Sequence, residues 1–146
     1  MKEETMKIML DEGAKMPTRA HPWDAGLDLY APEGEGVYCI PPCGGSVTID
    51  TLTHIQIPEG CTGFIKAKSG MNVKHGLTCT GVIDAHYTGS IAVKLYNHHP
   101  CLRYDVRPGD KIAQLVILPC LLPELEMVDS LEDTDRGDNG FGSTGR

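Results

Sequence analysis

Short hydrophobic runs rich in Val, Ile, Thr and Tyr recur along this chain, separated by glycine and proline. Polar and apolar positions alternate within several of them, as in residues 91–96, where Ile, Val and Leu occupy every second position. This pattern is typical of short strands in an all-β sandwich or barrel. We predict strands at residues 7–10, 27–30, 37–40, 47–51, 54–57, 63–68, 91–97, 112–118 and 125–128.

Two segments differ from these alternating strands. Residues 112–118 are apolar on both faces, so this strand is expected to be fully buried or to lie at a contact between subunits. Residues 69–75 form the one segment that we predict to be helical, and the helix is short.

The 146 residues are enough for one ordinary domain with its own core. With 13 basic and 20 acidic residues the net charge is −7, and most of it lies within residues 124–138. This balance disfavours general binding to nucleic acids or acidic membranes. No apolar run approaches the ~20 residues of a membrane span, and the N-terminus lacks the apolar core of a signal peptide. We therefore expect a cytoplasmic protein that binds neither nucleic acid nor membrane.

The six cysteines are scattered and include no Cys-x-x-Cys pair, so we expect reduced core thiols rather than disulfides or a zinc site. Composition divides the chain into a β-rich body, residues 1–123, and a C-terminal arm, residues 124–146. The arm ends in a glycine-rich segment with hydroxyl side chains and arginine. Such a segment is either a disordered terminus or a phosphate cradle, because glycine lets backbone amides converge on oxygen atoms.

Three polar residues interrupt apolar segments of the body. Asp28 lies inside an apolar strand, which is compatible with a strand edge. Asp84 follows two β-branched residues in a glycine-bounded turn, where it is either a catalytic base or a turn-capping residue. Gln114 shares a strand face with apolar residues, so its amide needs a partner on a neighbouring strand or a ligand.

Five segments, taken in order, resemble the five motifs of the dUTPase family. They are DAGLDLYA (24–31), KSG leading to KHGL (68–77), GVIDAHYTG (81–89), GDKIAQL (109–115) and RGDNGFGSTG (136–145). The resemblance implies a jelly-roll-like β-clip fold with one short helix and a flexible C-terminal arm. It also implies a homotrimer with active sites shared between subunits, and Mg²⁺-assisted hydrolysis of dUTP to dUMP and pyrophosphate. That reaction would limit uracil incorporation into DNA and supply dUMP for dTMP synthesis.

The resemblance assigns a role to each matching residue. Asp84 corresponds to the base that activates the attacking water at the α-phosphate, and Tyr87 to the residue that excludes a 2′-hydroxyl. Asp28 corresponds to a residue that reaches the metal through water. The residues implied in uracil recognition are Thr80, Gly81, Val82 and Ile83. The residues implied in phosphate binding within the body are Lys68, Ser69, Gly70 and Gln114.

The arm completes the implied site. Arg136 would bind the γ-phosphate, Phe141 would stack on uracil, and the segment Gly142, Ser143 and Thr144 would close on the phosphates.

The chain departs from the family pattern at several positions. Lys68 stands where arginine is commoner, which keeps the charge but loses the bidentate geometry. His86 replaces a frequent aspartate and either tunes Asp84 or is simply solvated. Asn139 replaces a usual glycine, and the stretch from Gly70 to Asp84 is one residue shorter than usual.

Three other functions are compatible with parts of this pattern. A dCTP deaminase relative would need a glutamate near the third motif, and residues 90–97 contain none. A nucleotide-gated regulator that binds dUTP and signals through a partner does not need Asp84 as a base. An inactive structural β-trimer would not need the motifs at all.

Overall fold

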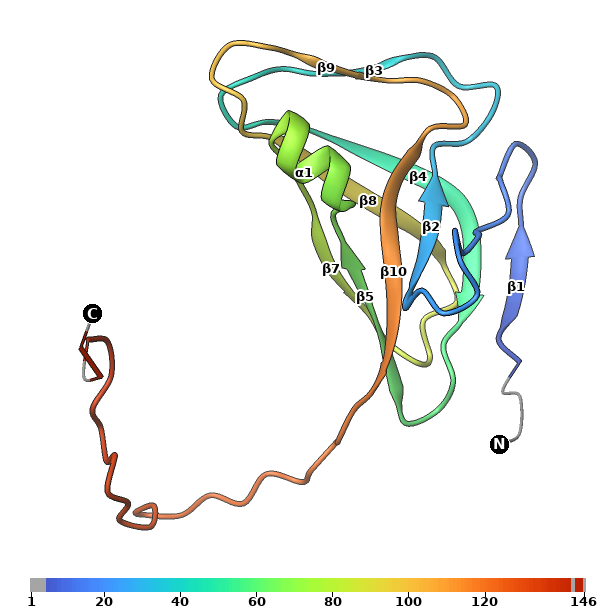
Figure 1. Ribbon diagram of the computed structural model, residues 1–146. Helices are drawn as coiled ribbons and strands as arrows, with labels where there is room; N and C mark the ends of the chain where they lie inside the picture. Colours follow the sequence, from blue (N-terminus) through green and yellow to red (C-terminus); the bar gives the residue numbers. More distant parts are fainter. Residues whose placement is uncertain (1–4, 143, 146) are drawn as a thin grey trace.

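A computed structural model of the protein describes residues 5–142 and 144–145 (Figure 1). The described residues form strands and one short helix, which confirms the all-β prediction. In chain order the elements are β1 (Lys7–Leu10), β2 (Gly26–Tyr30), β3 (Tyr38–Ile40), β4 (Gly45–Gln56), β5 (Cys61–Lys66), α1 (Ser69–His75), β6 (Leu77–Thr78), β7 (Thr80–Ile83), β8 (Ser90–Asn97), β9 (Tyr104–Val106) and β10 (Lys111–Pro119).

Two four-stranded sheets make a sandwich-like, jelly-roll-like body. One sheet has the order β1-β4-β8-β6, the other has the order β2-β10-β5-β7, and β3 pairs with β9. Alternate residues of each sheet point into a common core, among them Leu29, Ile49, Val93 and Leu115, which are at most 1% exposed. Burial of such side chains stabilises the sandwich by roughly 1.5–3 kcal/mol each.

Strand β4 replaces the two separate strands predicted at 47–51 and 54–57. Its pairing with β8 slips between Asp50 and His54, where the three residues 51–53 of β4 lie opposite the single residue 91 of β8. Leu52, inside this bulge, has φ +56°, a left-handed conformation that costs a non-glycine residue about 1–2 kcal/mol. The bulge interrupts the hydrogen-bond ladder without ending the strand, so the sequence pattern suggested a break.

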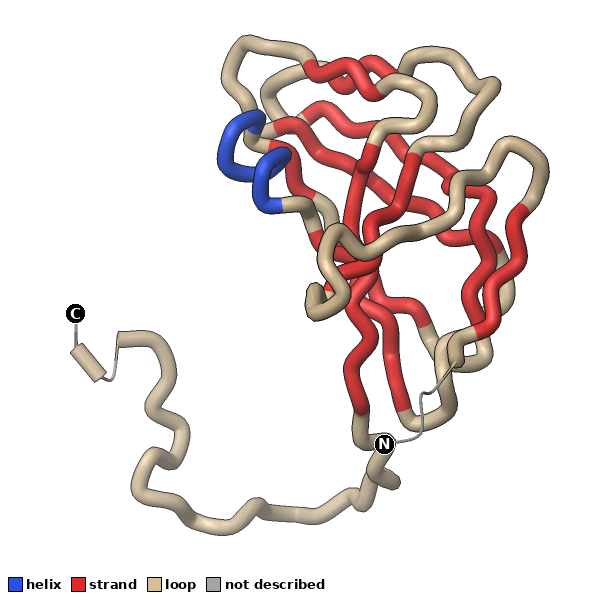
Figure 2. The backbone as a smooth tube through the Cα atoms, turned by 45° about the vertical axis from the view of Figure 1, so that its right-hand side comes forward, coloured by secondary structure: helices blue, strands red, loops and turns tan. Residues whose placement is uncertain are grey.

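The strand predicted at 125–128 does not form. Leu125 and Met127 are each 99% exposed, and the chain beyond β10 runs away from the body in both views (Figures 1 and 2). An alternating segment needs an unpaired strand edge beside it, and this part of the chain reaches none within its own body. Conversely, the short strands β6, β7 and β9 carry too few residues for their alternation to be recognised.

The cysteine prediction is correct for pairing and wrong for burial. All six thiols are free, but Cys39, Cys43 and Cys101 are exposed, and only Cys79 is buried. Full burial of residues 112–118 is also wrong, since Leu118 is 46% exposed. In the part of the chain that the structure describes, no helix is long and apolar enough to cross a membrane.

The first position of β4 requires glycine, Gly45, because the preceding turn packs closely against it, and this gives the first test. A Cβ on Gly45 would lie 2.4 Å from the Pro41 carbonyl oxygen, whereas a Cβ on Gly36 would meet nothing within 4 Å. We expect Gly45→Ala to lower the free energy of unfolding by about 1–3 kcal/mol and Gly36→Ala to leave it unchanged or slightly raised. Urea denaturation at one fixed protein concentration measures both, and equal midpoints for the two variants would contradict this packing.

Candidate functional site

A buried carboxylate, Asp28, organises the first group of candidate residues. It lies in the middle of β2 and is 4% exposed. Lys68 donates a hydrogen bond to its Oδ1, and the Nζ atom of Lys111 lies 2.8 Å from its Oδ2. Two ammonium groups therefore face one carboxylate, which leaves a net positive charge at the surface.

The ionised form of Asp28 is favoured by its surroundings. Burial raises the pKa of the carboxyl, but contact with the Lys111 and Lys68 ammonium groups outweighs burial and holds the pKa below its ordinary value. The same contact raises the pKa of Lys111. Lys111 is thus held in its charged form beside Asp28.

Gln114 belongs to the same group because of strand register. It lies opposite Asp28 on one side and opposite Lys66 on the other. Its Nε2 donates to the Ala67 carbonyl oxygen at 3.1 Å, so the partner that the sequence required is a neighbouring segment of the chain. A Cβ on Gly26 would lie 2.2 Å from its Oε1, so glycine at 26 is what leaves room for this amide. We call Asp28, Lys68, Lys111 and Gln114 the Lys68 cluster.

The start of α1 lies next to the Lys68 cluster. Lys68 immediately precedes the helix in an extended conformation, and Ser69 and Gly70 are exposed. A Cβ on Gly70 would meet nothing within 4 Å, so the space beside this turn is open. A ligand can approach the backbone here.

A turn at residues 84–87 carries the second group. The Tyr87 amide donates to the Asp84 carbonyl oxygen at 3.1 Å, and the Tyr87 hydroxyl donates to the Ser90 carbonyl oxygen at 2.9 Å. The Asp84 side chain is exposed and makes no hydrogen bond within residues 5–142 and 144–145, so it is neither a buried carboxylate nor a turn cap. His86 is also exposed, which favours the solvated alternative for this residue.

A hollow of about 220 Å³ lies beside this turn. Its lining residues are Val82, Ile83, Asp84, Tyr87, Ser90 and Ala92. Strand β7, which supplies the first two, is the edge of its sheet. Edge strands present unpaired N–H and C=O groups, so the hollow combines backbone donors and acceptors with an exposed carboxylate and an aromatic ring.

Cys79, just before β7, is the only buried thiol among the described residues and is not a nucleophile for this hollow. Burial raises the pKa of its thiol to about 11, so the reactive thiolate is scarce near neutral pH.

The two groups lie far apart within one chain. Thr80 pairs with Lys66 at one end of β7 and Ile83 pairs with Gly63 at the other, about 10 Å away. Asp84 continues beyond one end and Lys68 beyond the other. Asp28 is three strand spacings from β7, about 14 Å across the sheet. Side chains that bind one phosphate must approach it within about 3 Å, so a single subunit does not bring both groups to it.

The arm meets neither group. Phe141 is fully exposed, and Arg136 donates from Nε to the Asn139 carbonyl oxygen at 3.2 Å within its own turn. Gly142 and Thr144 are also exposed, while Ser143 lies outside the described residues. Thus the expected site residues fall into three separate places in one chain.

The donor atoms present fit a hydrated magnesium ion rather than a protein-enclosed one. Among the described residues no three His, Cys, Asp or Glu side chains converge on one point. Asp28 Oδ2 is buried and accepts no hydrogen bond of good angle despite its contact with Lys111, so it retains a free lone pair. Mg²⁺ usually keeps several waters and binds through one or two carboxylates and substrate phosphates.

Sequence reasoning missed Lys111. A register irregularity between Lys111 and Ala113 lets Lys111 reach the same carboxylate as Lys68. The alternation of apolar and polar residues along the strand gives no sign of this irregularity. The one signal in the sequence is that a basic residue, Lys111, stands three positions before Gln114.

Comparison with known proteins identifies relatives over nearly the whole chain. A family model of dUTPases matches residues 12–145. A probable deoxyuridine 5'-triphosphate nucleotidohydrolase of Schizosaccharomyces pombe is 43% identical over 137 residues, which cover 93% of this chain and 94% of that protein. The deoxyuridine 5'-triphosphate nucleotidohydrolase of rabbitpox virus is 46% identical over 132 residues, covering 90% and 86%.

Solved structures agree with these relatives. The dUTPase of Staphylococcus bacteriophage 80alpha with dUPNHPP superposes with a TM-score of 0.87 at 32% identity, covering 97% of this chain and 99% of that one. A mutant dUTPase from phage phi11 of S. aureus, described with a structural Mg(II) ion, gives a TM-score of 0.79 at 30% identity, covering 89% and 100%.

From the Asp28 ion pairs we predict how the free energy of unfolding depends on this carboxylate and on pH. At neutral pH we expect Asp28→Asn to lower the free energy of unfolding by about 1.5–3 kcal/mol, since the charge-assisted hydrogen bond from Lys68 and the ion pair with Lys111 are lost. Because the pKa of Asp28 is depressed in the folded state, this advantage of the wild type is present above its ordinary value of 3.8 and shrinks as the pH falls below it.

Urea unfolding at neutral and acidic pH measures this difference. Asp105→Asn is the matched control: Asp105 pairs with the exposed Arg103 at 3.3 Å, and its loss should cost under about 1 kcal/mol. A gap between wild type and Asp28→Asn that does not narrow in acid would contradict the ionised pairs.

Proposed function

This chain belongs to the dUTPase family, and we propose that it converts dUTP and water into dUMP and pyrophosphate with Asp84 as the base. The observation that carries the proposal is the exposed Asp84 carboxylate at the mouth of a hollow lined by Tyr87 and by the edge strand β7. In the cell, this reaction lowers the dUTP available for incorporation into DNA and yields dUMP for dTMP synthesis.

Asp84 accepts the proton of the attacking water. A carboxylate held on a short turn offers an acceptor to a water molecule in line with the α-phosphorus, and positioning of this kind supplies much of the rate. The Tyr87–Asp84 backbone hydrogen bond and the Tyr87–Ser90 contact fix the turn that carries both side chains.

The base and sugar bind along β7. Free main-chain groups of Thr80, Gly81, Val82 and Ile83 at the sheet edge match the donors and acceptors of a uracil edge. The Tyr87 ring covers the deoxyribose and excludes a 2′-hydroxyl. Gly89 is required for this ring position, since a Cβ there would lie 2.4 Å from the Tyr87 hydroxyl oxygen.

The Lys68 cluster and the start of α1 bind the phosphates. Lys68, Gln114 and the exposed turn at Ser69 and Gly70 supply charge and hydrogen-bond donors. Asp28 would hold Mg²⁺ through water, and the ion supplies neutralisation of phosphate charge when bound. Because Asp28 orients Lys68, the same residue serves both the metal and the phosphates.

A homotrimer resolves the separation of the two groups. In it, the Lys68 cluster of one subunit faces the Asp84 turn of a second, and the arm of a third closes over both. Exposed apolar side chains support such contacts, because Leu118 and Val82 on the sheet and Leu121, Leu122 and Leu125 beyond β10 are exposed in one chain.

The assignment of Asp84 gives a direct kinetic prediction. Asp84→Asn should reduce pyrophosphate release from dUTP by several orders of magnitude while a non-hydrolysable analogue still binds, because Asn cannot accept the proton of water. The control is Asp129→Asn, which removes an exposed arm carboxylate and should keep the full rate.

Parallel assays with dUTP, dCTP and UTP separate the functional alternatives. Pyrophosphate release from dUTP alone supports the hydrolase, and ammonia release from dCTP would indicate a deaminase. A wild-type protein that binds dUTP without turnover would be a regulator, and a wild-type rate for Asp84→Asn would refute the base assignment.

The arm should be needed for turnover and not for folding. No residue from 136 to 142 packs on the core, so deletion of 136–146 should leave the unfolding midpoint unchanged. Turnover should fall nearly to zero, because the phosphates lose Arg136 and the site stays open to water. Phe141→Ala should lose about one stacking contact, 1–3 kcal/mol. Full-rate hydrolysis by the truncated protein would show that the body alone holds the phosphates.

A further inference from the structure

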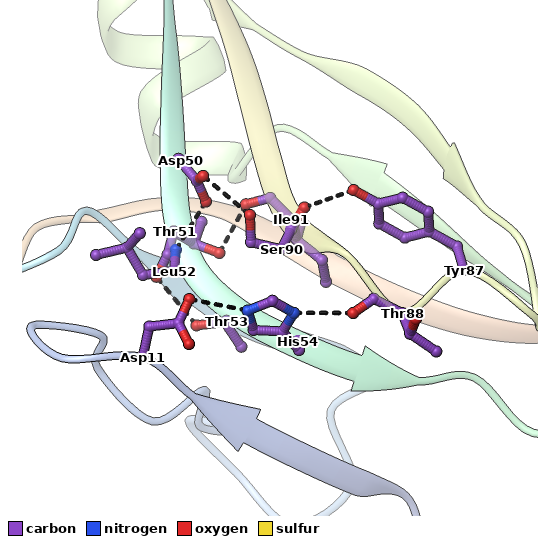
Figure 3. A network of polar contacts seen from close by, with 10 residues as sticks. All are labelled: Asp11, Asp50, Thr51, Leu52, Thr53, His54, Tyr87, Thr88, Ser90 and Ile91. Carbon is purple, nitrogen blue, oxygen red and sulfur yellow. Dashed lines mark hydrogen bonds and ion pairs between the residues drawn. The ribbon is translucent and has the colours of Figure 1, made fainter.

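His54 joins two segments of the chain from opposite sides of its ring. It lies on β4, opposite Ser90 of β8 and Met9 of β1. Its Nδ1 lies 2.8 Å from the Thr88 carbonyl oxygen, and its Nε2 lies 2.9 Å from Asp11 Oδ2 (Figure 3). The side chain is 19% exposed, so the imidazole is held between these two contacts rather than solvated.

Both contacts of the ring are with acceptors. A carbonyl oxygen and a carboxylate oxygen accept hydrogen bonds and donate none, whereas a neutral imidazole carries a single N–H. Only the imidazolium donates to Thr88 and Asp11 at once, so the geometry fits the protonated ring.

The Thr88 carbonyl belongs to the turn that carries Asp84 and Tyr87. Residue 88 directly follows Tyr87, whose amide and hydroxyl bond to Asp84 and Ser90. The Ser90 hydroxyl lies 2.9 Å from Asp50 Oδ2, while Asp50 Oδ1 accepts from the Leu52 amide in the β4 bulge (Figure 3). His54 and Asp50 therefore attach this turn to β4 at two points.

We propose that protonated His54 is a positioning residue for hydrolysis, which holds the Asp84–Tyr87 turn in place by binding the Thr88 carbonyl and Asp11 together. This inference rests on the proposed function of Asp84. Loss of the proton removes one of the two bonds and leaves the turn less fixed, so turnover falls as the pH rises. Nucleotide binding changes less, because the Lys68 cluster is untouched.

The charged groups around His54 favour the proton. Asp11 faces it from the segment after β1 and Asp50 lies on β4 itself, whereas Lys7 of β1, which carries the opposite charge, lines a second hollow together with His54 and Thr88. The Asp11 hydrogen bond and then the Thr88 carbonyl raise the pKa of His54 above its ordinary value of 6.5. We call the two hydrogen bonds from His54 to Thr88 and Asp11 the His54 clamp. Both bonds form at low pH, and one of them is lost as the pH rises through this raised pKa.

Three variants test the clamp. His54→Gln carries both N–H donors on one nitrogen, so it does not reach acceptors on opposite sides of the ring position. It should lower kcat for dUTP by about 10- to 100-fold at pH ~6, with a smaller change in KM. His54→Arg keeps several donors and never loses its charge, so it should retain turnover and abolish the decline at high pH. Asp11→Asn should move that decline to lower pH. His21→Gln, at an exposed loop histidine, is the control and should match the wild type.

The pH profile of kcat and an NMR titration of the histidine rings decide the outcome. The proposal requires the wild-type decline in kcat to coincide with the His54 titration and to disappear in His54→Arg. It is overturned if His54→Gln keeps the wild-type kcat and profile, or if His54 titrates at or below pH 6.5. If the wild type releases no pyrophosphate at any pH, the proposed function has failed, and a His54 titration above 6.5 would then show a structural clamp only.

Discussion

Strand β10 hydrogen-bonds to β2 on one side and to β5 on the other, and this double pairing determines where Asp28, Lys111 and Gln114 lie. The register aligns Asp28 with Gln114, and the irregularity after Lys111 brings a second ammonium group onto the same carboxylate. The two ammonium groups thereby compensate the buried charge of Asp28, on the face of the sheet that points away from the core. The same register places β7 at the far edge, so the Lys68 cluster and the Asp84 turn are separated by the width of the sheet.

This separation explains features that have no purpose in an isolated subunit. Asp84 is exposed, Phe141 packs on nothing, and the apolar side chains of Leu118 and of the arm residues Leu125 and Met127 are exposed. A rigid sandwich cannot fold back on itself to bring its two ends together, since its core is close-packed. In the homotrimer that we propose, several copies come together and each contributes a different part to each site. If the sites are shared in this way, dUTP hydrolysis requires that the subunits associate.

The sequence predicted the elements that depend on local pattern. Strand β8 follows the strict alternation of residues 91–96, and α1 ends where Gly76, with φ +67°, supplies the left-handed conformation of a helix end. The Leu52 bulge, the Lys111 contact and the His54 clamp were not predictable, because each depends on which residue lies opposite on a distant strand. The motifs predicted the candidate residues as a set, and their roles stay a prediction; the motifs could not show that one chain keeps these residues apart.

Subunit complementation tests the shared site most directly. A Lys68→Ala/Gln114→Ala variant lacks the phosphate contacts and an Asp84→Asn variant lacks the base, so each alone should be nearly inactive. When equal amounts are unfolded and refolded together, about one quarter of the sites should combine an intact Lys68 cluster from one subunit with an intact Asp84 from another. Recovery of about a quarter of the wild-type dUTP hydrolysis is the result that the account predicts. A mixture no more active than its two components would show that each subunit holds a complete site, and would contradict it.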